Sequence, residues 1–246
     1  MSAEVMLMPK LKRSNDRKVT NAVTSGGNVA IANTFGLPSG KAYSCPGATS
    51  VCETVCYAGK LEKVYKGVRE NLLHNWNLLK DATTDEAYAL LREMVDDFVN
   101  DCERRGAPML FRIHWDGDFF NKDYTKAWRR VIKDTPEVTY WVYTRSDWAV
   151  PMLKGIENLT VYFSTDTENA KAAARLRKKH GTLLATLGAT FKDADEATRT
   201  ITGRPSGRCP ENTGQMPLIA PEGSACVRCD LCVHGKADIL FSSSKR

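Results

Sequence analysis

The segment CPGATSVCETVCYA, residues 45–58, carries three of the eight cysteines of this 246-residue chain, Cys45, Cys52 and Cys56. It follows a short β-prone run, Asn28 to Thr34, and a connection with the turn-forming residues Gly36, Pro38 and Gly40. Runs of this kind predict a strand followed by a loop. A strand that leads into a cysteine loop is therefore the starting point for the fold.

Four further cysteines lie toward the C-terminus: Cys209 and the run Cys226, Cys229 and Cys232. Three cysteines spaced C-x2-C-x2-C can ligate three corners of one compact cluster, as in many iron–sulfur proteins. Structural zinc usually takes its cysteines in two separated pairs. The pattern favours iron and sulfide, with zinc as an alternative. Disulfides are a further alternative only in an oxidising compartment.

Two ligand arrangements are compatible with these seven cysteines. In the first, Cys209 and the C-terminal run hold one [4Fe-4S] cluster, and Cys45, Cys52 and Cys56 hold a second with one iron left open. In the second, a single cluster takes four thiolates from both groups, because the last strand of a barrel lies beside the first. The eighth cysteine, Cys102, belongs to an apolar helical stripe and is interpreted as a buried core residue.

Beyond residue 60 the apolar residues repeat first with a helical period and then in strands that alternate with helices. Repeated strand–helix units predict a parallel sheet. We expect an α/β fold, a TIM-like or partial (β/α) barrel of six or seven strands, with the cluster at its C-terminal rim. Residues 1–27 are expected to form an irregular arm, and residues 28–246 a single barrel domain with a cysteine-rich C-terminal segment. The predicted helices cover residues 60–79, 84–105, 122–134, 147–156, 168–180 and 192–203, and the predicted strands cover 28–34, 109–114, 138–144, 159–164, 183–187, 216–220 and 238–242.

Composition narrows the function. The hydrophobic fraction of 42% and charged fraction of 26% are ordinary for a globular protein, and no apolar run is long enough to span a membrane. The basic residues near the start follow the short apolar run, unlike those of a signal peptide, so we expect a cytoplasmic protein with reduced thiols. The net charge of +6 comes from scattered residues without interleaved aromatic residues. Nucleic-acid binding therefore has only weak support.

Polar residues gather where the predicted strands end, and in parallel barrels this edge carries the chemistry. Alternation after residue 110 places Arg112, His114 and Asp116 on the face that lines the barrel lumen. We take Asp116, Asp118, His114 and Arg145 as candidate catalytic residues. A structural role is the alternative for each: His114 as a hydrogen-bonded histidine, and the aspartates at positions 116, 118, 147 and 166 as helix N-caps.

The three-cysteine loop ending Cys-Tyr-Ala, followed by a strand that ends in Asp116-Gly117-Asp118, resembles the radical S-adenosylmethionine (SAM) enzymes. The resemblance implies an open-iron cluster on Cys45, Cys52 and Cys56, and SAM contacts from Gly117, Asp118, Ser164 and Asp166. Those enzymes carry C-x3-C-x2-C and Gly-Gly-Glu, whereas this chain has C-x6-C-x3-C and Asp-Gly-Asp.

A closer resemblance rests on a set of motifs: Cys-Pro-Gly-Ala, Cys-x3-Cys-Tyr-Ala, Arg-Ile-His-x-x-Gly-Asp-Phe, Tyr-Thr-Arg-Ser and the C-terminal Cys-x2-Cys-x2-Cys. Together they are similar to the phage domain family called gene product eighty-eight, over about residues 28–240. This resemblance implies a phage or prophage origin, an iron–sulfur cluster and a barrel fold, and leaves the reaction open.

Three functions follow as hypotheses. Because the cysteine spacing and the Gly-Gly-Glu motif both differ from those of radical SAM enzymes, we favour a [4Fe-4S] ferredoxin-like electron-transfer protein. The first alternative is a radical SAM enzyme that cleaves SAM at an open iron. The second is a zinc-stabilised binding module. The expected partner is a redox protein or a small-molecule substrate.

Overall fold

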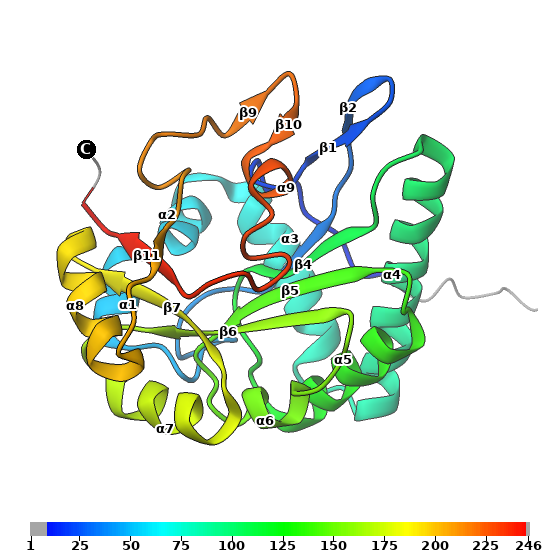
Figure 1. Ribbon diagram of the computed structural model, residues 1–246. Coiled ribbons are helices and arrows are strands. Elements are labelled where there is room, and N and C mark those ends of the chain that lie inside the picture. Colours follow the sequence, from blue (N-terminus) through cyan, green and yellow to red (C-terminus); the bar gives the residue numbers. More distant parts are fainter. Residues whose placement is uncertain (1–8, 245–246) are drawn as a thin grey trace, which may run out of the picture.

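A computed structural model describes residues 9–244 of the chain. Its centre is a seven-stranded, all-parallel sheet with the strand order β3-β4-β5-β6-β7-β11-β8. Figure 1 labels β4, β5, β6, β7 and β11 of this sheet. Every strand of this sheet except the last in sequence, β11, is followed by at least one helix before the next strand of the sheet, which confirms the predicted α/β class. The strands are β3 Thr34–Gly36, β4 Leu110–Asp116, β5 Thr139–Thr144, β6 Leu159–Thr165, β7 Leu183–Gly188, β8 Gly207–Arg208 and β11 Ile239–Ser242.

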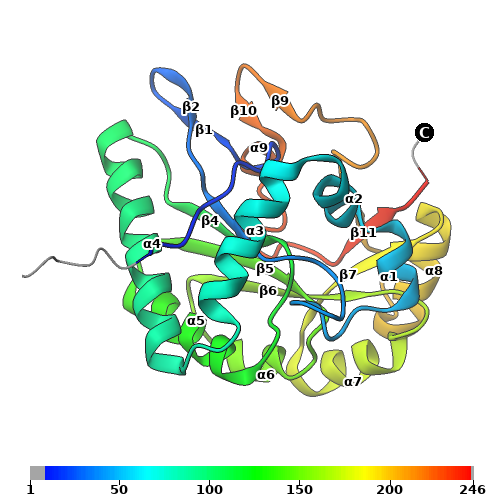
Figure 2. The ribbon, with the colours of Figure 1, turned by 180° about the vertical axis from the view of Figure 1, so that it is seen from behind.

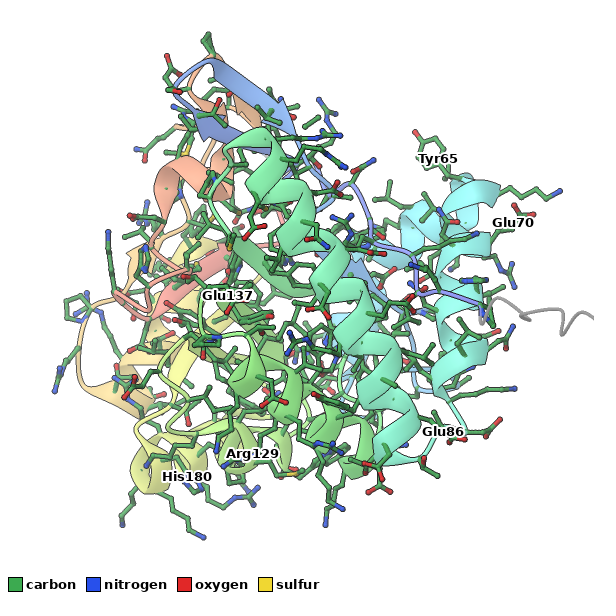
Figure 3. The ribbon with its side chains drawn as sticks, turned by 90° about the vertical axis from the view of Figure 1, so that its right-hand side faces the viewer. Tyr65, Glu70, Glu86, Arg129, Glu137 and His180 are labelled. Atoms are coloured by element: carbon green, nitrogen blue, oxygen red, sulfur yellow. The ribbon has the colours of Figure 1, made fainter. Side chains whose placement is uncertain are left out.

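Five helices pack side by side along one face of the sheet: α4 Thr84–Arg105, α5 Lys122–Asp134, α6 Ala149–Leu153, α7 Ala170–His180 and α8 Phe191–Thr202. Their ends follow local capping rules. Thr83 and Glu86 form a capping box at the start of α4, and Gly106 ends the helix with a left-handed φ of 63°. Figure 3 labels Glu86 at the lower end of α4. All five match predicted helical segments.

The opposite face of the sheet is covered by irregular chain from both ends of the sequence (Figures 1 and 2). Two small antiparallel hairpins lie there, and the short helix α9, Ala225–Cys229, follows the second. The first hairpin, β1 Asn21–Thr24 with β2 Gly27–Ala30, contacts β10 of the second, which pairs β9 Ile219–Ala220 with β10 Gly223–Ser224. This cover carries the C-terminal cysteines onto the sheet.

A closed barrel is not seen. Within residues 9–244 the sheet has two free ends, β3 and β8, which do not pair with each other. These strands are only three and two residues long, which is too short to close a barrel ladder. The prediction that the last strand lies beside the first is also wrong. The last strand, β11, lies between β7 and β8, at the far side of the sheet from β3.

Three further expectations are corrected. The predicted strand at 28–34 is divided between β2 and β3, and only the end of the predicted strand at 216–220 is extended, as β9 in a separate hairpin. The arm predicted as irregular contains β1 and is tied to the core: the Ser14 amide donates to the Thr34 carbonyl at 2.8 Å, and Arg13 pairs with Asp101. Residues 1–8 of that arm lie outside the described residues.

The hydrophobic core fills the space between the sheet and helices α3 Lys66–Leu79, α4 and α5. The predicted outward alternation of β4 is correct for Phe111 and Ile113, which are fully buried in this core. His114 departs from it, because its φ of 60° turns the side chain back toward the helices. Its ring packs against Phe119, Tyr124 and Trp128, so His114 does not face the strand-end site.

His114 is a structural residue, as the alternative interpretation held. Its Nε2 hydrogen-bonds with the Tyr124 hydroxyl at 2.7 Å, and burial, aided by the charge of Arg112, lowers its pKa to about 3. The unfolded chain therefore binds a proton at this position between about pH 6.5 and pH 3, and the native state does not.

Stability carried by the neutral His114 is thus complete above about pH 6.5 and is lost as the pH falls toward 3. We expect the free energy of unfolding to fall through this window by up to about 1.4 kcal/mol per pH unit more in the wild type than in His114→Gln. Urea titrations between pH 4 and 7.5 measure both slopes. Equal slopes would show that the native His114 accepts a proton.

No helix between residues 9 and 244 combines the length and the apolar character that crossing a bilayer requires.

Candidate functional site

The three N-terminal cysteines line one pocket. Cys45 lies in the loop after β3, Cys52 in helix α1, Ser50–Val55, and Cys56 at the junction with α2, Tyr57–Val64. The pocket has a volume of about 380 Å³ and is open to solvent. The structure therefore brings together side chains that the sequence placed in one group, at the carboxyl end of β3.

The loop is fixed by short-range hydrogen bonds around the cysteines. The Thr49 hydroxyl is the N-cap of α1 and accepts from the Cys52 amide at 3.1 Å. The Cys56 thiol accepts from the Gly59 amide at 3.3 Å and so caps α2. Because both cysteines lie in the first turn or at the N-cap of a helix, the capping geometry fixes the Cys52 backbone and the Cys56 sulfur.

Two glycines let this loop lie directly on the ends of β4 and β5. A Cβ at Gly47 would collide with the backbone of Arg145, and a Cβ at Gly117 would lie 2.5 Å from the Ser44 hydroxyl and 2.8 Å from Leu37. Gly117 also has a φ of +83°, a conformation that side chains disfavour. The glycines of the Cys-Pro-Gly-Ala and Asp-Gly-Asp motifs are thus required by close backbone approach.

Asp118 joins the ends of β4 and β5. Its carboxylate accepts hydrogen bonds from the Phe119 amide at 2.7 Å, the Thr144 hydroxyl at 2.6 Å and the Arg145 amide at 2.7 Å. Burial raises the pKa of Asp118 to about 6 although these hydrogen bonds oppose the rise. With three donors already bound, Asp118 acts chiefly as a brace beneath the cysteine loop.

Arg145 and Asp166 form a buried ion pair beside Cys52. The guanidinium donates to the Asp166 carboxylate at 2.7 Å and to the Thr49 hydroxyl at 3.3 Å, and Thr49 in turn donates to Asp166 at 2.6 Å. The charges of Arg145 and Asp166 both act on the Cys52 thiol, whose pKa is raised mainly by burial. The strand-end residues of β5 and β6 are therefore joined to the cysteine loop, as the sequence predicted.

The predicted N-cap roles of the strand-end aspartates are wrong. The N-cap of α5 is Asn121, whose side chain accepts from the Tyr124 amide, and the N-cap positions of α6 and α7 are Trp148 and Asn169. The aspartates lie earlier in each connection, and Asp147 pairs with Arg175 at the surface. Ser164 contributes its carbonyl to the Asn169 amide group at 3.0 Å and so supports the turn after β6.

Asp116 lies beneath the pocket next to Glu62, a pocket residue that the sequence did not single out. Burial and the neighbouring Glu62 carboxylate raise the pKa of Asp116 to about 9. Its Oδ1 accepts from the Gly117 amide at 2.8 Å, and its Oδ2 has no partner within residues 9–244. Asp116 therefore holds a proton at neutral pH close to Cys45 and Cys56.

The four C-terminal cysteines form a second group on the sheet face that the helices leave uncovered. Cys232 is its centre: a negative charge on Cys209 or Cys229 would raise the pKa of its thiol, and a negative charge on Cys232 would raise the pKa of Cys226. Cys209, Cys226 and Cys232 pack in the clusters formed by Trp141, Tyr143 and Tyr162 of β5 and β6. Burial raises the pKa of both Cys226 and Cys232 to about 12, so without a cation the thiols stay protonated.

Polar groups from distant parts of the chain surround this second group. Arg112 pairs with Asp16 at 2.6 Å, and its guanidinium lies 5.5 Å from the Tyr143 ring centre. Its positive charge opposes the rise in the pKa of Cys226 and Cys232 that burial causes. Arg112 and Trp141 are register partners on neighbouring strands. Three buried N–H groups here have no hydrogen-bond partner in the described part of the chain: Arg112 Nε, Trp141 Nε1 and Arg228 Nη1.

Comparison with known proteins gives the family. A family profile described as "Gene product 88" matches residues 9–235. The chain belongs to the Gene product 88 family. It is 53% identical over 245 residues to the Gene 88 protein of Mycobacterium phage L5 and 50% identical over 246 residues to that of Mycobacterium phage D29; each alignment covers 97% of this chain and 100% of the relative. No solved structure matches the chain.

In this Gene product 88 family member the two cysteine groups are kept apart. None of the four C-terminal cysteines lines the pocket of the first group. Tyr57, which directly follows Cys56, lies between the two groups. Its hydroxyl donates to the Trp115 carbonyl at 2.9 Å, and Lys18 Nζ lies 5.8 Å from its ring centre. The Lys18 ammonium in turn interacts electrostatically with the Cys226 thiol.

Neither group is arranged around one ion. In the described range, no three histidine, cysteine, aspartate or glutamate side chains converge as they would on a single metal ion. All eight cysteines are free thiols, so the disulfide alternative has no support in the structure. Cys102 lies on α4 and is fully buried in the core, as expected. The sequence did not identify Glu62, Trp141 and Tyr143 as site residues. Trp141 and Tyr143 share a strand face with Arg112, and this alternation is the signal that could have identified them.

Proposed function

We propose that this protein is an iron–sulfur redox protein with two cluster sites, a four-thiolate site at Cys209, Cys226, Cys229 and Cys232 and a three-thiolate site in the pocket of Cys45, Cys52 and Cys56. The observation that carries the proposal is the separation of the two groups, with four cysteines on the sheet face and three in an open pocket. A bound cluster would supply one-electron oxidation and reduction.

The donor set at the four-cysteine group fits an anionic cluster. Buried N–H groups without partners are costly, and Arg112 Nε, Trp141 Nε1 and Arg228 Nη1 are three of them at or beside one cysteine group. Hydrogen bonds to cluster sulfurs are a common use of such donors. The positive charges of Arg112 and Lys18 oppose the burial that keeps Cys226 protonated.

The pocket group fits a cluster with one open iron, because it offers three thiols and no fourth cysteine. Here the chain's own residues hold the loop in place: Arg145, Asp166 and Thr49 fix the start of α1, and Asp118 fixes the strand ends beneath it. Asp116 keeps a proton near the thiols. An open position in a solvent-accessible pocket is where a small molecule would bind.

Anaerobic iron and sulfide analysis with EPR tests the proposal. Two [4Fe-4S] clusters imply about eight irons per chain, and one implies about four. Zinc and no iron in oxygen-protected protein would overturn it.

Radical SAM chemistry is the second candidate for the pocket, favoured by the open three-thiol geometry next to Gly117 and Asp118. Reduced protein mixed with SAM would then release 5′-deoxyadenosine, and the EPR signal of the pocket cluster would change on adding SAM. Unchanged EPR and no 5′-deoxyadenosine over hours would leave electron transfer as the function of both sites.

Trp141 provides a test of the four-thiolate site. We expect Trp141→Phe to lower the reduction potential of that cluster, because one N–H donor to sulfur is lost. A hydrogen bond worth about 1 kcal/mol corresponds to about 40 mV for a one-electron couple. EPR-monitored redox titration measures the shift. Trp148→Phe is the matched control, because Trp148 also has an unpartnered indole N–H but lies on the helix-covered side.

A further inference from the structure

We infer that the cysteine pocket binds a compact, multiply charged organic or inorganic anion, held at its rim by Lys60, Lys63 and Arg69. The inference adds a ligand class to the proposed function and rests on it only in taking this pocket as the site where a small molecule binds. It is carried by the charges that line the pocket, and it does not need the cluster to be present.

The three rim cations come from neighbouring helices and line one cavity. Lys60 and Lys63 lie on α2, one helical turn apart, and Arg69 lies on the first turn of α3. The link between these helices is Tyr65, which projects outward in Figure 3. All three cations are solvent-exposed, and within residues 9–244 none of them forms an ion pair or a side-chain hydrogen bond.

Most other cations near this site are already paired, which sets these three apart. Lys41 lies 3.9 Å from Glu53, Lys66 lies 3.6 Å from Glu70, and Arg145 is bound to Asp166. Three unpaired like charges around one opening repel each other and gain from a shared anion.

The acidic residues of the pocket do not neutralise the rim. Glu62 accepts from the Ser39 amide at 2.9 Å and from the Ser39 hydroxyl at 2.5 Å, which holds its carboxylate at the inner wall. Glu53 is turned toward Lys41. The uncompensated charge at the mouth is therefore positive, while the thiols lie deeper.

The size and lining of the pocket also fit a small ligand. Its volume of about 380 Å³ is within the range of small-molecule sites. Tyr43 and Leu73 give it an apolar wall, and the Tyr43 ring is held by an edge-on contact with Trp76 at 6.0 Å. Phosphate esters and polycarboxylates share the required charge, and lysine and arginine bind both.

Isothermal titration calorimetry with pyrophosphate and with citrate tests the inference on the full-length protein as purified, with its iron content measured in parallel. We expect at least one of the two anions to bind, and the triple variant Lys60→Gln/Lys63→Gln/Arg69→Gln to weaken that binding by at least tenfold. The matched control is Lys122→Gln/Lys133→Gln/Lys154→Gln, which removes the same charge from α5 and the end of α6, where none of the three residues lines the pocket, and it should bind as the wild type does.

The result identifies the chemical class of the anion and tests the inference separately from the proposed function. Binding of pyrophosphate alone points to a phosphorylated ligand, and binding of citrate alone points to a polycarboxylate. No binding of either at millimolar concentration, or equal binding by the rim variant, overturns the inference even in iron-loaded protein. Rim-dependent binding by protein that is iron-free after oxygen-protected purification would support the inference and contradict the proposed clusters.

Discussion

Replacing Cys226 and Cys229 with alanine should lower the iron content of anaerobically purified protein from about eight to about four atoms per chain. Both residues lie in α9, and their group shares no pocket with Cys45, Cys52 and Cys56. The reciprocal variant, Cys45→Ala with Cys52→Ala and Cys56→Ala, should also retain about four irons. Colorimetric iron and sulfide analysis gives both counts.

Cys102→Ala is the control for this experiment. Cys102 lies on α4 and is fully buried in a core cluster that contains no other cysteine, so its replacement should cost stability and leave the iron content unchanged. Loss of all iron from either multiple variant, with the fold intact by circular dichroism, would favour one cluster drawn from both groups. Iron loss in Cys102→Ala alone would contradict the ligand assignment.

Gly117→Ala should have the largest effect on stability of any single glycine substitution near the site. The new methyl group would lie 2.5–2.8 Å from Ser44 and Leu37, and the backbone φ of +83° would strain alanine as well. Together these effects are expected to cost roughly 3 kcal/mol. Urea unfolding at pH 7 measures this cost.

Gly67→Ala is the matched comparison. Gly67 lies in α3, has an ordinary helical backbone, and has open space within 4 Å of the point where an alanine Cβ would lie. Alanine should therefore stabilise the protein there by about 0.5–1 kcal/mol. If Gly117→Ala were as stable as Gly67→Ala, the close approach of the Cys45 loop to β4 would be disproved. If it were unstable but kept pocket access, measured by alkylation of Cys52, the loop would not depend on this contact.

Much of the helix and strand pattern could be predicted because each signal is local. The capping box at Thr83 and Glu86, the apolar stripe of α4 and the alternating strands depend on neighbouring residues. Closure of the sheet could not be predicted in the same way. It depends on the lengths of β3 and β8 and on where β11 inserts, which are properties of long-range pairing.

The candidate site shows the same division. The three-cysteine group and its approach to Asp118, Arg145 and Asp166 follow from the rule that strand ends meet at one edge of a parallel sheet. The predicted position of His114 in the lumen was wrong, because its own φ of 60° reverses the strand alternation on which that prediction depended. Glu62 was missed because only tertiary folding brings α2 over the end of β4.

The position of β11 has a consequence for synthesis of the chain. Strand β8 precedes β11 in the sequence but lies outside it, and β8 pairs with no other strand of the sheet. Until Ile239–Ser242 leaves the ribosome, β7 therefore presents an unpaired edge to solvent, and such edges invite association with other chains. A nascent protein that stalls before residue 239 would be aggregation-prone, and translation of β11 completes its protection.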